Sequence, residues 1–373
     1  ANGVMVRYLD CNDSYFSPGG GHPSDMIPAA LAVADTLHST GKELITAIVL
    51  AYEVFCRLSD KVEVSHLGWD QGCFSVIGAA CAAGKMMGLN KIQMANAISL
   101  SLAPNLPLRV TRTGELSMWK GCATASATRA AIFAAQLASD GMTGPGEPFD
   151  GPSGLCQLAL AGQSITPDVM GGGNEPFRII NTTVKNYPSQ IHTQAPIGLA
   201  LELQPKLNIA DIKSITIHTY SNAVSTPSDA PEKWAPKTRE SADHSIPFTV
   251  AAAFRDGQVT PNTFIDASIS DTTIAKIIEK ITLKEDPSFT ARYSDEYNCH
   301  MEITTHSGES LIAKTSFPKG HKNNPLDDGE LDEKFCKLAM PTLTEEQCKQ
   351  ALALLWDSEN LPNLDELFDS LVV

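Results

Sequence analysis

The sequence lacks any pair of cysteines spaced as C-x-x-C, although nine cysteines occur among its 373 residues. Common zinc and iron–sulfur sites use such pairs, and an odd number of thiols gives no support for a disulfide framework. Basic residues are also scarce, because 28 Lys and Arg stand against 43 Asp and Glu, for a formal net charge of −15. Nucleic acids and anionic membranes attract proteins with an excess of Lys and Arg, so we expect neither as a partner.

Long uninterrupted apolar runs are missing too, and no segment is long enough to cross a bilayer. Hydrophobic residues make up 43% of the chain and charged residues 19%, which is typical of a globular protein with a large core. No signal peptide is visible, and the chain opens at Ala1 in the middle of a pattern, so we interpret it as a fragment or a processed chain. Thiols without a pairing pattern favour a reducing compartment, which is the cytoplasm or, in a eukaryote, the mitochondrion.

The first half of the chain has the periodicity of buried helices. Ser24 and Asp25 are candidate N-caps, and apolar or small residues then recur at helical spacing, with Gly and Pro between the segments. Apolar residues on most faces indicate a packed all-helical domain over about 1–177. The predicted helices cover 26–39, 43–58, 74–87, 91–102 and 121–138.

From about residue 178 the pattern changes to mixed strands and helices, which predicts a smaller α+β domain over 178–322. Residues 323–373 return to helical periodicity, with a predicted capping box at Thr342–Glu345, and we expect them to pack back on the helical domain. The predicted fold class is therefore mainly α. The strands expected in the smaller domain are 212–220, 298–303 and 311–315, and its helices include 247–254 and 272–281.

An acidic protein that binds an anionic substrate must gather cationic groups locally, so Lys and His in Gly-rich or apolar contexts are candidate site residues. Residues 10–25 join a polar cluster, which contains Asp10 and Ser14, to a triple glycine and then to His22 just before a helix start. Glycines allow close backbone approach to a ligand, a helix N-terminus attracts anions, and His titrates near neutrality. A surface turn with a solvated His is the alternative interpretation.

Lysine marks two further segments. Lys120 stands at the start of a helix of small residues, where it is either partly desolvated or extends to solvent. Lys185 opens a second segment, in which Gln190, His192 and Gln194 surround a proline turn. These donors either grip carboxylates or serve as capping and surface residues.

The other histidines carry weaker signals. His244 follows Asp243, an adjacency that suits an oriented imidazole or a helix start equally well. No remaining His has metal-ligand spacing, so we interpret these residues as structural or surface groups. They are His38, His66, His218, His300, His306 and His321. We expect no metal and no cofactor.

The sequence resembles the MmgE/PrpD family in a series of segments that run in order over about residues 1–260 and thin out afterwards. Jointly they are specific to the family, whose members usually carry a further N-terminal helical segment. The segments are ANGVMVRYLDCNDSY, GGGHPSDMIPAALA, AIVLAYEVFCRL, WDQGCFSVIGAAC with AAGKMMGL, LSMWKGCATASATRAAIFAAQLA, KNYPSQIHTQ and DHSIPFTVAAAF.

This resemblance implies a large helical domain with a smaller α+β lid, and a homodimer. It implies a metal-independent dehydration of 2-methylcitrate to 2-methyl-cis-aconitate in propionate breakdown, so the expected substrate is a small polycarboxylate. Cis-aconitate decarboxylase and iminodisuccinate epimerase are similar proteins, which leaves decarboxylation and dicarboxylate isomerisation as alternatives. A non-catalytic helical interaction protein is a further alternative, and it predicts no cationic pocket.

Carried onto this sequence, the resemblance places Asp10, Ser14, His22, Lys120 and Lys185 in the site. For a dehydration we expect His22 as base or acid with Asp10 orienting it, and the two lysines on substrate carboxylates.

The second acid or base is expected to be His192. Substrate-binding roles are expected for Ser14, Gln190, Gln194 and His244. Decarboxylase relatives carry His at the position of Gln190 and Tyr at that of Phe248, and both departures disfavour the decarboxylase alternative.

Overall fold

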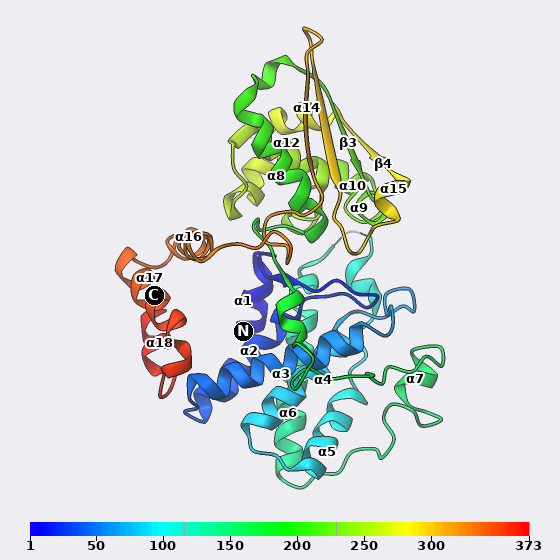
Figure 1. Cartoon of the computed structure of the whole chain (residues 1–373), viewed down its shortest axis with the longest axis vertical. Coiled ribbons are helices and arrows are strands. Elements are labelled where there is room, and N and C mark those ends of the chain that lie inside the picture. Colours follow the sequence, from blue (N-terminus) through cyan, green and yellow to red (C-terminus); the bar gives the residue numbers. More distant parts are fainter. Residues whose placement is uncertain (115, 229, 373) are drawn as a thin grey trace.

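The computed structural model describes residues 1–114, 116–228 and 230–372, and it is mainly helical with a small sheet, as the sequence predicts (Figure 1). Among these residues no helix combines the length and hydropathy needed to cross a membrane. The helices expected in the first half are all present close to their predicted bounds. They are α2 (Ile27–Thr36), α3 (Gly41–Ser59), α4 (Gly72–Met86), α5 (Lys91–Leu102) and α6 (Ala123–Ser139).

Helices α2 to α6 pack together into one helical unit. Helix α4 forms its centre, because it packs against the other four of these helices. Its Gly and Ala residues are nearly all buried, and they permit this close packing. A Cβ on Gly78 would lie 2.8 Å from the carbonyl oxygen of Ala51 on α3, so glycine is needed where these helices meet. The resulting core extends through loop 149–165 to the C-terminal residues Leu361, Leu364 and Leu367.

The N-terminal region differs from the sequence prediction in two ways. Ser24 and Asp25 do not cap α2 but lie inside the 3₁₀ helix η1 (Pro23–Met26). The Ser24 hydroxyl donates to Asp13 Oδ1 at 2.5 Å, so this side chain ties the helix to the preceding loop instead. The short helix α1 (Asn2–Tyr8) was not predicted at all.

The second unit contains a four-stranded sheet made of β3 (Ile212–Thr219), β4 (Ile281–Glu285), β5 (Cys299–Thr305) and β6 (Ser310–Thr315). The strand order is β4-β3-β5-β6, in which β3 and β4 are parallel and the other pairs antiparallel. Helices α8 (Gln194–Leu203) and α12 (Ile246–Asp256) contribute to a separate core with the sheet. The predicted helix 272–281 is wrong at its end. Helix α14 (Thr272–Ile278) stops early, because residues 281–285 pair in parallel with β3 as strand β4.

The C-terminal segment forms α16 (Asp328–Ala339), α17 (Glu345–Trp356) and α18 (Asp365–Ser370) beside the helical unit (Figure 1). The capping box of α17 uses Thr344 and Gln347, two residues after the predicted one. The exact domain boundaries stay a prediction. Shorter helices complete the chain: α7 (Leu155–Leu158), α9 (Ser221–Ser225), α10 (Pro231–Trp234), α11 (Arg239–Ala242), α13 (Asp266–Ile269) and α15 (Pro287–Thr290).

A two-stranded sheet at the junction joins the two units. Strand β1 (Asp13–Ser14) pairs antiparallel with β2 (Thr183–Val184), and the Lys185 N–H donates to the carbonyl of Asn12 at 3.4 Å. This pairing brings the Gly-rich loop of the first unit beside the chain that enters the second.

Gly41 tests the docking of the C-terminal segment on α3. Its N–H donates to the Leu361 carbonyl at 2.9 Å, and an added Cβ would meet the Ser358 carbonyl oxygen at 1.7 Å. We expect Gly41→Ala to lower the free energy of unfolding by about 1–3 kcal/mol and to speed proteolysis of the C-terminal helices. Gly146→Ala is the control, because its Cβ would meet no described atom within 4 Å. Equal urea midpoints for the two variants would contradict this docking.

Candidate active site

A cavity of about 630 Å³ opens at the junction of the two units, with walls from both. Segments that are distant in sequence meet there, as the sequence interpretation required. Of the predicted site residues, the cavity lining includes Asp10, Ser14, His22, Lys185, Gln190, His192 and His244. Lys120 and Gln194 do not belong to that lining.

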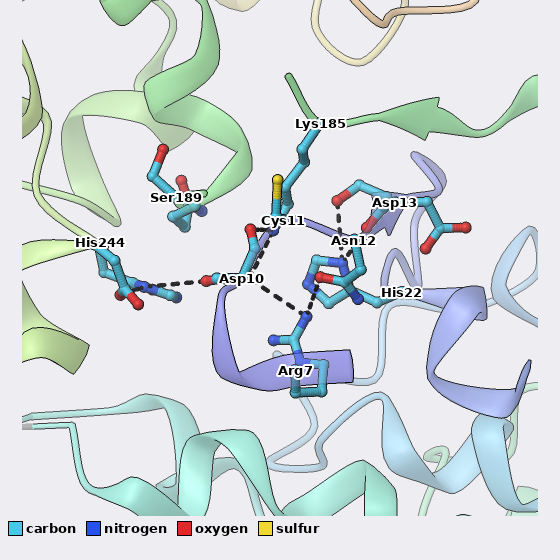
Figure 2. A network of polar contacts seen from close by, with 12 residues as sticks. Arg7, Asp10, Cys11, Asn12, Asp13, His22, Lys185, Ser189 and His244 are labelled. Atoms are coloured by element: carbon cyan, nitrogen blue, oxygen red, sulfur yellow. Dashed lines mark hydrogen bonds and ion pairs between the residues drawn. The ribbon is translucent and has the colours of Figure 1, made fainter. Parts of the chain in front are cut away.

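Asp10 and Lys185, which both line the cavity, form an ion pair (Figure 2). The Lys185 ammonium donates to Asp10 Oδ1 at 2.7 Å and to the Asp10 carbonyl at 3.0 Å. Asp10 has φ of 50°, a left-handed conformation that Asp tolerates better than most residues. Arg7 adds a second cation at 3.4 Å from Oδ1. Both members of the pair are buried, so this contact joins the two units without help from solvent.

A second ion pair supports the first. The Lys120 ammonium donates to both carboxylate oxygens of Asp243, at 2.9 and 3.0 Å, and lies 3.7 Å from Asp10 Oδ2. The Asp243 carboxylate also accepts from His244 Nδ1 at 2.5 Å. The prediction that both lysines hold substrate carboxylates therefore needs correction. Lys120 is committed to protein carboxylates behind the cavity wall, whereas Lys185 reaches the cavity and keeps one N–H of its ammonium free of a described partner.

These contacts keep the buried carboxylates ionised. Burial alone would raise the pKa of Asp10, but Lys185 and then Arg7 hold it well below its usual range. Burial likewise opposes ionisation of Asp243, and Lys120 with His244 lowers its pKa. Burial also lowers the pKa of Lys185, an effect that Asp10 offsets in part. The site is thus an array of charges that protein contacts hold in place.

His22 is oriented by the backbone. Its Nδ1 lies 2.6 Å from the Asp13 carbonyl oxygen and 3.1 Å from Ser14 Oγ. A carbonyl only accepts, so Nδ1 carries the proton and the neutral ring keeps a lone pair on Nε2, which has no hydrogen-bond partner in the described chain. The expectation that Asp10 orients His22 is therefore wrong. Burial, followed by Arg7 and Lys185, lowers the pKa of His22 well below its ordinary value.

The triple glycine shapes the loop that carries His22. Gly21 has φ of 136°, and a Cβ there would lie 2.1 Å from Gln71 Oε1. Reciprocal hydrogen bonds between Tyr15 and Gly21, at 2.8 and 3.1 Å, close the loop. The close approach seen here is to protein atoms, and the predicted approach of this backbone to a ligand stays a prediction.

In the segment after Lys185, some polar side chains line the cavity, whereas others hydrogen-bond only to the protein. Gln190 lines the cavity and its Oε1 accepts from the His192 N–H at 2.7 Å. His192 also lines the cavity, and its Nδ1 lies 2.7 Å from the Tyr220 hydroxyl. The prediction that Gln194 binds substrate is not supported, because its amide bonds the backbone of the proline turn, including two contacts to Tyr187. Phe248 is buried in the second core.

Several cavity residues were missed from the sequence. Arg109 and Arg112, spaced three apart in a 3₁₀ helix, line the cavity, and Arg112 pairs with Asp70 at 2.7 Å. Such a pair of cations in an acidic chain was a usable signal. Arg7 gave none, because it lies in the unpredicted α1. His66, interpreted as structural or superficial, is exposed but does border the cavity.

One group of carboxylate and imidazole atoms is compact enough to bind a metal ion within the described chain. Asp10, Asp243 and His244 place ligand atoms within 4.8 Å of one another. Their carboxylates already bind the ammonium groups of Lys120 and Lys185. A divalent cation would have to displace or repel these charges, so the donor set suits internal ion pairs better than a metal.

Comparison with known proteins decides the family. The MmgE/PrpD N-terminal domain matches residues 1–168, and the MmgE/PrpD C-terminal domain matches residues 187–358. The chain belongs to the MmgE/PrpD family. Among its relatives is the 2-methylcitrate dehydratase of Escherichia coli (strain K12), 28% identical over 79% of this chain and 63% of that protein. The chain therefore spans less than two thirds of that relative's length.

Two other MmgE/PrpD relatives cover more of the chain. The 2-methylcitrate dehydratase of Salmonella typhi is 27% identical over 92% of this chain and 75% of its own length. A protein from Yarrowia lipolytica named 2-methylcitrate dehydratase, mitochondrial, is 26% identical over 97% of this chain and 73% of its own length.

The buried pair provides the first test of this site. Asp10→Asn leaves the Lys185 ammonium without its carboxylate in a fully buried position, and breaking a buried pair costs about 3–5 kcal/mol. We expect the free energy of unfolding, measured in urea, to fall by that amount. Glu202→Gln, which breaks the exposed 3.1 Å pair with Lys206, should change it by less than about 1 kcal/mol. A near-native midpoint for Asp10→Asn would show that Asp10 is not essential to the junction.

Proposed function

We propose that this protein is a metal-independent hydro-lyase that dehydrates a small tricarboxylate such as 2-methylcitrate to 2-methyl-cis-aconitate. One observation carries the proposal: an imidazole with a free Nε2 lone pair, His22, shares a cavity with Lys185 and with a second imidazole, His192. Dehydration beside a carboxylate needs a base, a proton donor and cations together. Relatives named 2-methylcitrate dehydratase support the same reaction class.

The cations of the cavity suit a substrate with several carboxylates. Lys185 has one ammonium N–H without a described partner, and Arg109 and Arg112 border the same cavity. Arg112 also has a buried terminal nitrogen with no partner among the described residues. Buried donors without acceptors are costly, so a bound carboxylate would satisfy groups that the free protein leaves open. We place the substrate carboxylates on these cations.

In the proposed reaction His22 Nε2 removes the proton from the carbon beside a carboxylate. The C–H electron pair becomes the new C=C bond, the C–O bond breaks, and the leaving hydroxide takes a proton from an enzyme acid to become water. His192 is the proposed acid. His244, whose Nδ1–H donates to Asp243, also has a lone pair on Nε2 and is the alternative base. The family resemblance supports a homodimer as the assembly, which sedimentation velocity would test.

His22 and Lys185 are tested by substitution in the full-length protein. We expect His22→Gln to lower kcat for 2-methylcitrate by about 10²–10⁴-fold, because general-base catalysis supplies that factor. Lys185→Ala should lose most activity while remaining folded. His38→Gln, at an exposed position, is the control. Near-normal turnover in either site variant removes that residue from the mechanism, and loss of activity in His244→Gln alone would transfer the base role to His244.

The pH dependence gives an independent test of His22 as the base. Burial and neighbouring cations lower the pKa of His22 in the free protein, so it stays deprotonated well below pH 6.5. Bound carboxylates bring negative charge to the ring and raise its pKa. We therefore expect kcat to fall with decreasing pH at a higher pH than kcat/KM does, after correction for substrate ionisation. Coincident acid limbs would contradict a base held among cations.

Solvent isotope exchange separates elimination from isomerisation. We expect new absorbance from a conjugated alkene with 2-methylcitrate in deuterated buffer, and undiminished turnover after exhaustive chelation. Deuterium incorporation into a dicarboxylate such as iminodisuccinate without loss of hydroxide would favour an epimerase instead. Loss of activity on chelation, restored by a metal ion, would overturn the metal-independent mechanism. Citrate and cis-aconitate complete the substrate panel.

A further inference from the structure

Tyr220 is a buried residue outside the cavity wall that touches one of the two proposed acid–base groups. It follows β3 directly, and its hydroxyl lies 2.7 Å from Nδ1 of His192. That is the only hydrogen bond of the Tyr220 hydroxyl in the described part of the chain. His192 Nε2 has no hydrogen-bond partner there, so it is the ring nitrogen left for a ligand in the cavity that His192 lines.

Packing fixes the position of the Tyr220 ring. Its plane stacks on Tyr293 with centroids 4.6 Å apart, and its edge meets Tyr297 at 5.8 Å. The imidazole of His192 approaches Tyr220 edge-on at 5.5 Å. An aromatic cluster of this kind restricts both rings, so the hydroxyl and Nδ1 are held together by the fold rather than by their hydrogen bond alone.

Two proton arrangements are possible for this contact. If the Tyr220 hydroxyl donates to Nδ1, the phenol proton has an acceptor. The imidazole proton then lies on Nε2, where it is available to a ligand in the cavity. If Nδ1–H donates to the phenol oxygen, the phenol proton is left without an acceptor in a buried position. Unsatisfied buried donors are rarer and costlier than acceptors with a spare lone pair, so the first arrangement dominates.

The state of each group is consistent with that arrangement. Burial raises the pKa of Tyr220 well above its usual value, so the phenol keeps its proton. Burial, then His244 and Lys185, lowers the pKa of His192 to about 3, so its imidazole is neutral. A neutral imidazole can still act as a hydrogen-bond donor and electrophile in a dry site.

We propose that Tyr220 is a positioning residue that holds His192 in the tautomer with its proton on Nε2, and thereby makes His192 the proton donor to the departing hydroxyl. The role of His192 as proton donor rests on the proposed dehydratase function, whereas the assignment of its tautomer does not. His22 and His192 then have opposite tautomers, because the Asp13 carbonyl demands a proton on Nδ1 of one ring and the Tyr220 hydroxyl supplies one to Nδ1 of the other.

The proton balance of the step follows from these tautomers. His22 Nε2 gains the substrate proton, and the hydroxide leaving group takes the Nε2 proton of His192 as the C–O bond breaks. Negative charge then grows on the His192 ring, and the hydrogen bond from Tyr220 to Nδ1 strengthens in the transition state. Exchange with solvent returns a proton to His192 and removes one from His22.

The tautomer is measured by two-bond ¹H–¹⁵N correlation spectra of full-length protein labelled in histidine, with the His192 signals assigned from their absence in His192→Gln. We expect a protonated Nε2 and an unprotonated Nδ1 in the native protein. In Tyr220→Phe, which keeps the ring and its packing, the two tautomers should become mixed. Tyr297→Phe is the matched control, because its buried hydroxyl has no partner among the described residues.

Kinetics of the same variants separate positioning from structure. We expect Tyr220→Phe to lower kcat for 2-methylcitrate about tenfold with little change in KM, since Tyr220 does not line the cavity, and Tyr297→Phe to leave both unchanged. A proton on Nδ1 of His192 in the native protein, or a Tyr220→Phe variant with native tautomer and kcat, would overturn the proposal. If the tautomer depends on Tyr220 but no polycarboxylate is dehydrated, the positioning role stands and the proposed function fails.

Discussion

The contact between the Lys185 ammonium and the Asp10 carboxylate is the constraint on which the site depends. It crosses from the segment that enters the second unit to the first loop of the helical unit, and both groups are buried. A buried charge without a partner is very costly, so these two segments cannot separate without a large penalty. The neighbouring β1–β2 pairing gives the same junction a fixed register. The ion pair and the backbone hydrogen bonds therefore hold the cavity walls of the two units in a fixed relative position.

This junction also explains how an acidic protein can present a cationic cavity. The formal charge of −15 is spread over the chain, whereas arginines and lysines gather at the point where the two units meet. Asp10 and Asp243 offset part of that positive charge and keep the ammonium groups of Lys185 and Lys120 in place. The result is a set of preorganised donors that need little rearrangement when an anion arrives.

The two histidines of the proposed mechanism obtain their orientation from different sources. His22 depends on a backbone carbonyl in a loop whose glycines permit close packing. His192 depends on the hydroxyl of Tyr220, which is held by an aromatic cluster of the second unit. Each unit therefore supplies one imidazole and the group that sets its proton. Acid and base roles in such a site are assigned by neighbouring atoms rather than by residue type.

The sequence by itself determined the helical first half, because periodic apolar residues, glycines and prolines define those helices locally. It also marked His22, Lys185, His192 and His244 as candidates, although local roles in turns, caps or at the surface stayed open for each of them. It could not determine which of them contact one another. The tertiary structure placed Lys120 behind the cavity wall and engaged the Gln194 amide in hydrogen bonds to a turn. It also brought Arg7, Arg109 and Arg112 to the cavity. The Lys120–Asp243 contact joins residues 123 positions apart and the Arg112–Asp70 pair joins residues 42 positions apart. Local pattern carries no information about such pairings, because they form only when the chain folds back on itself.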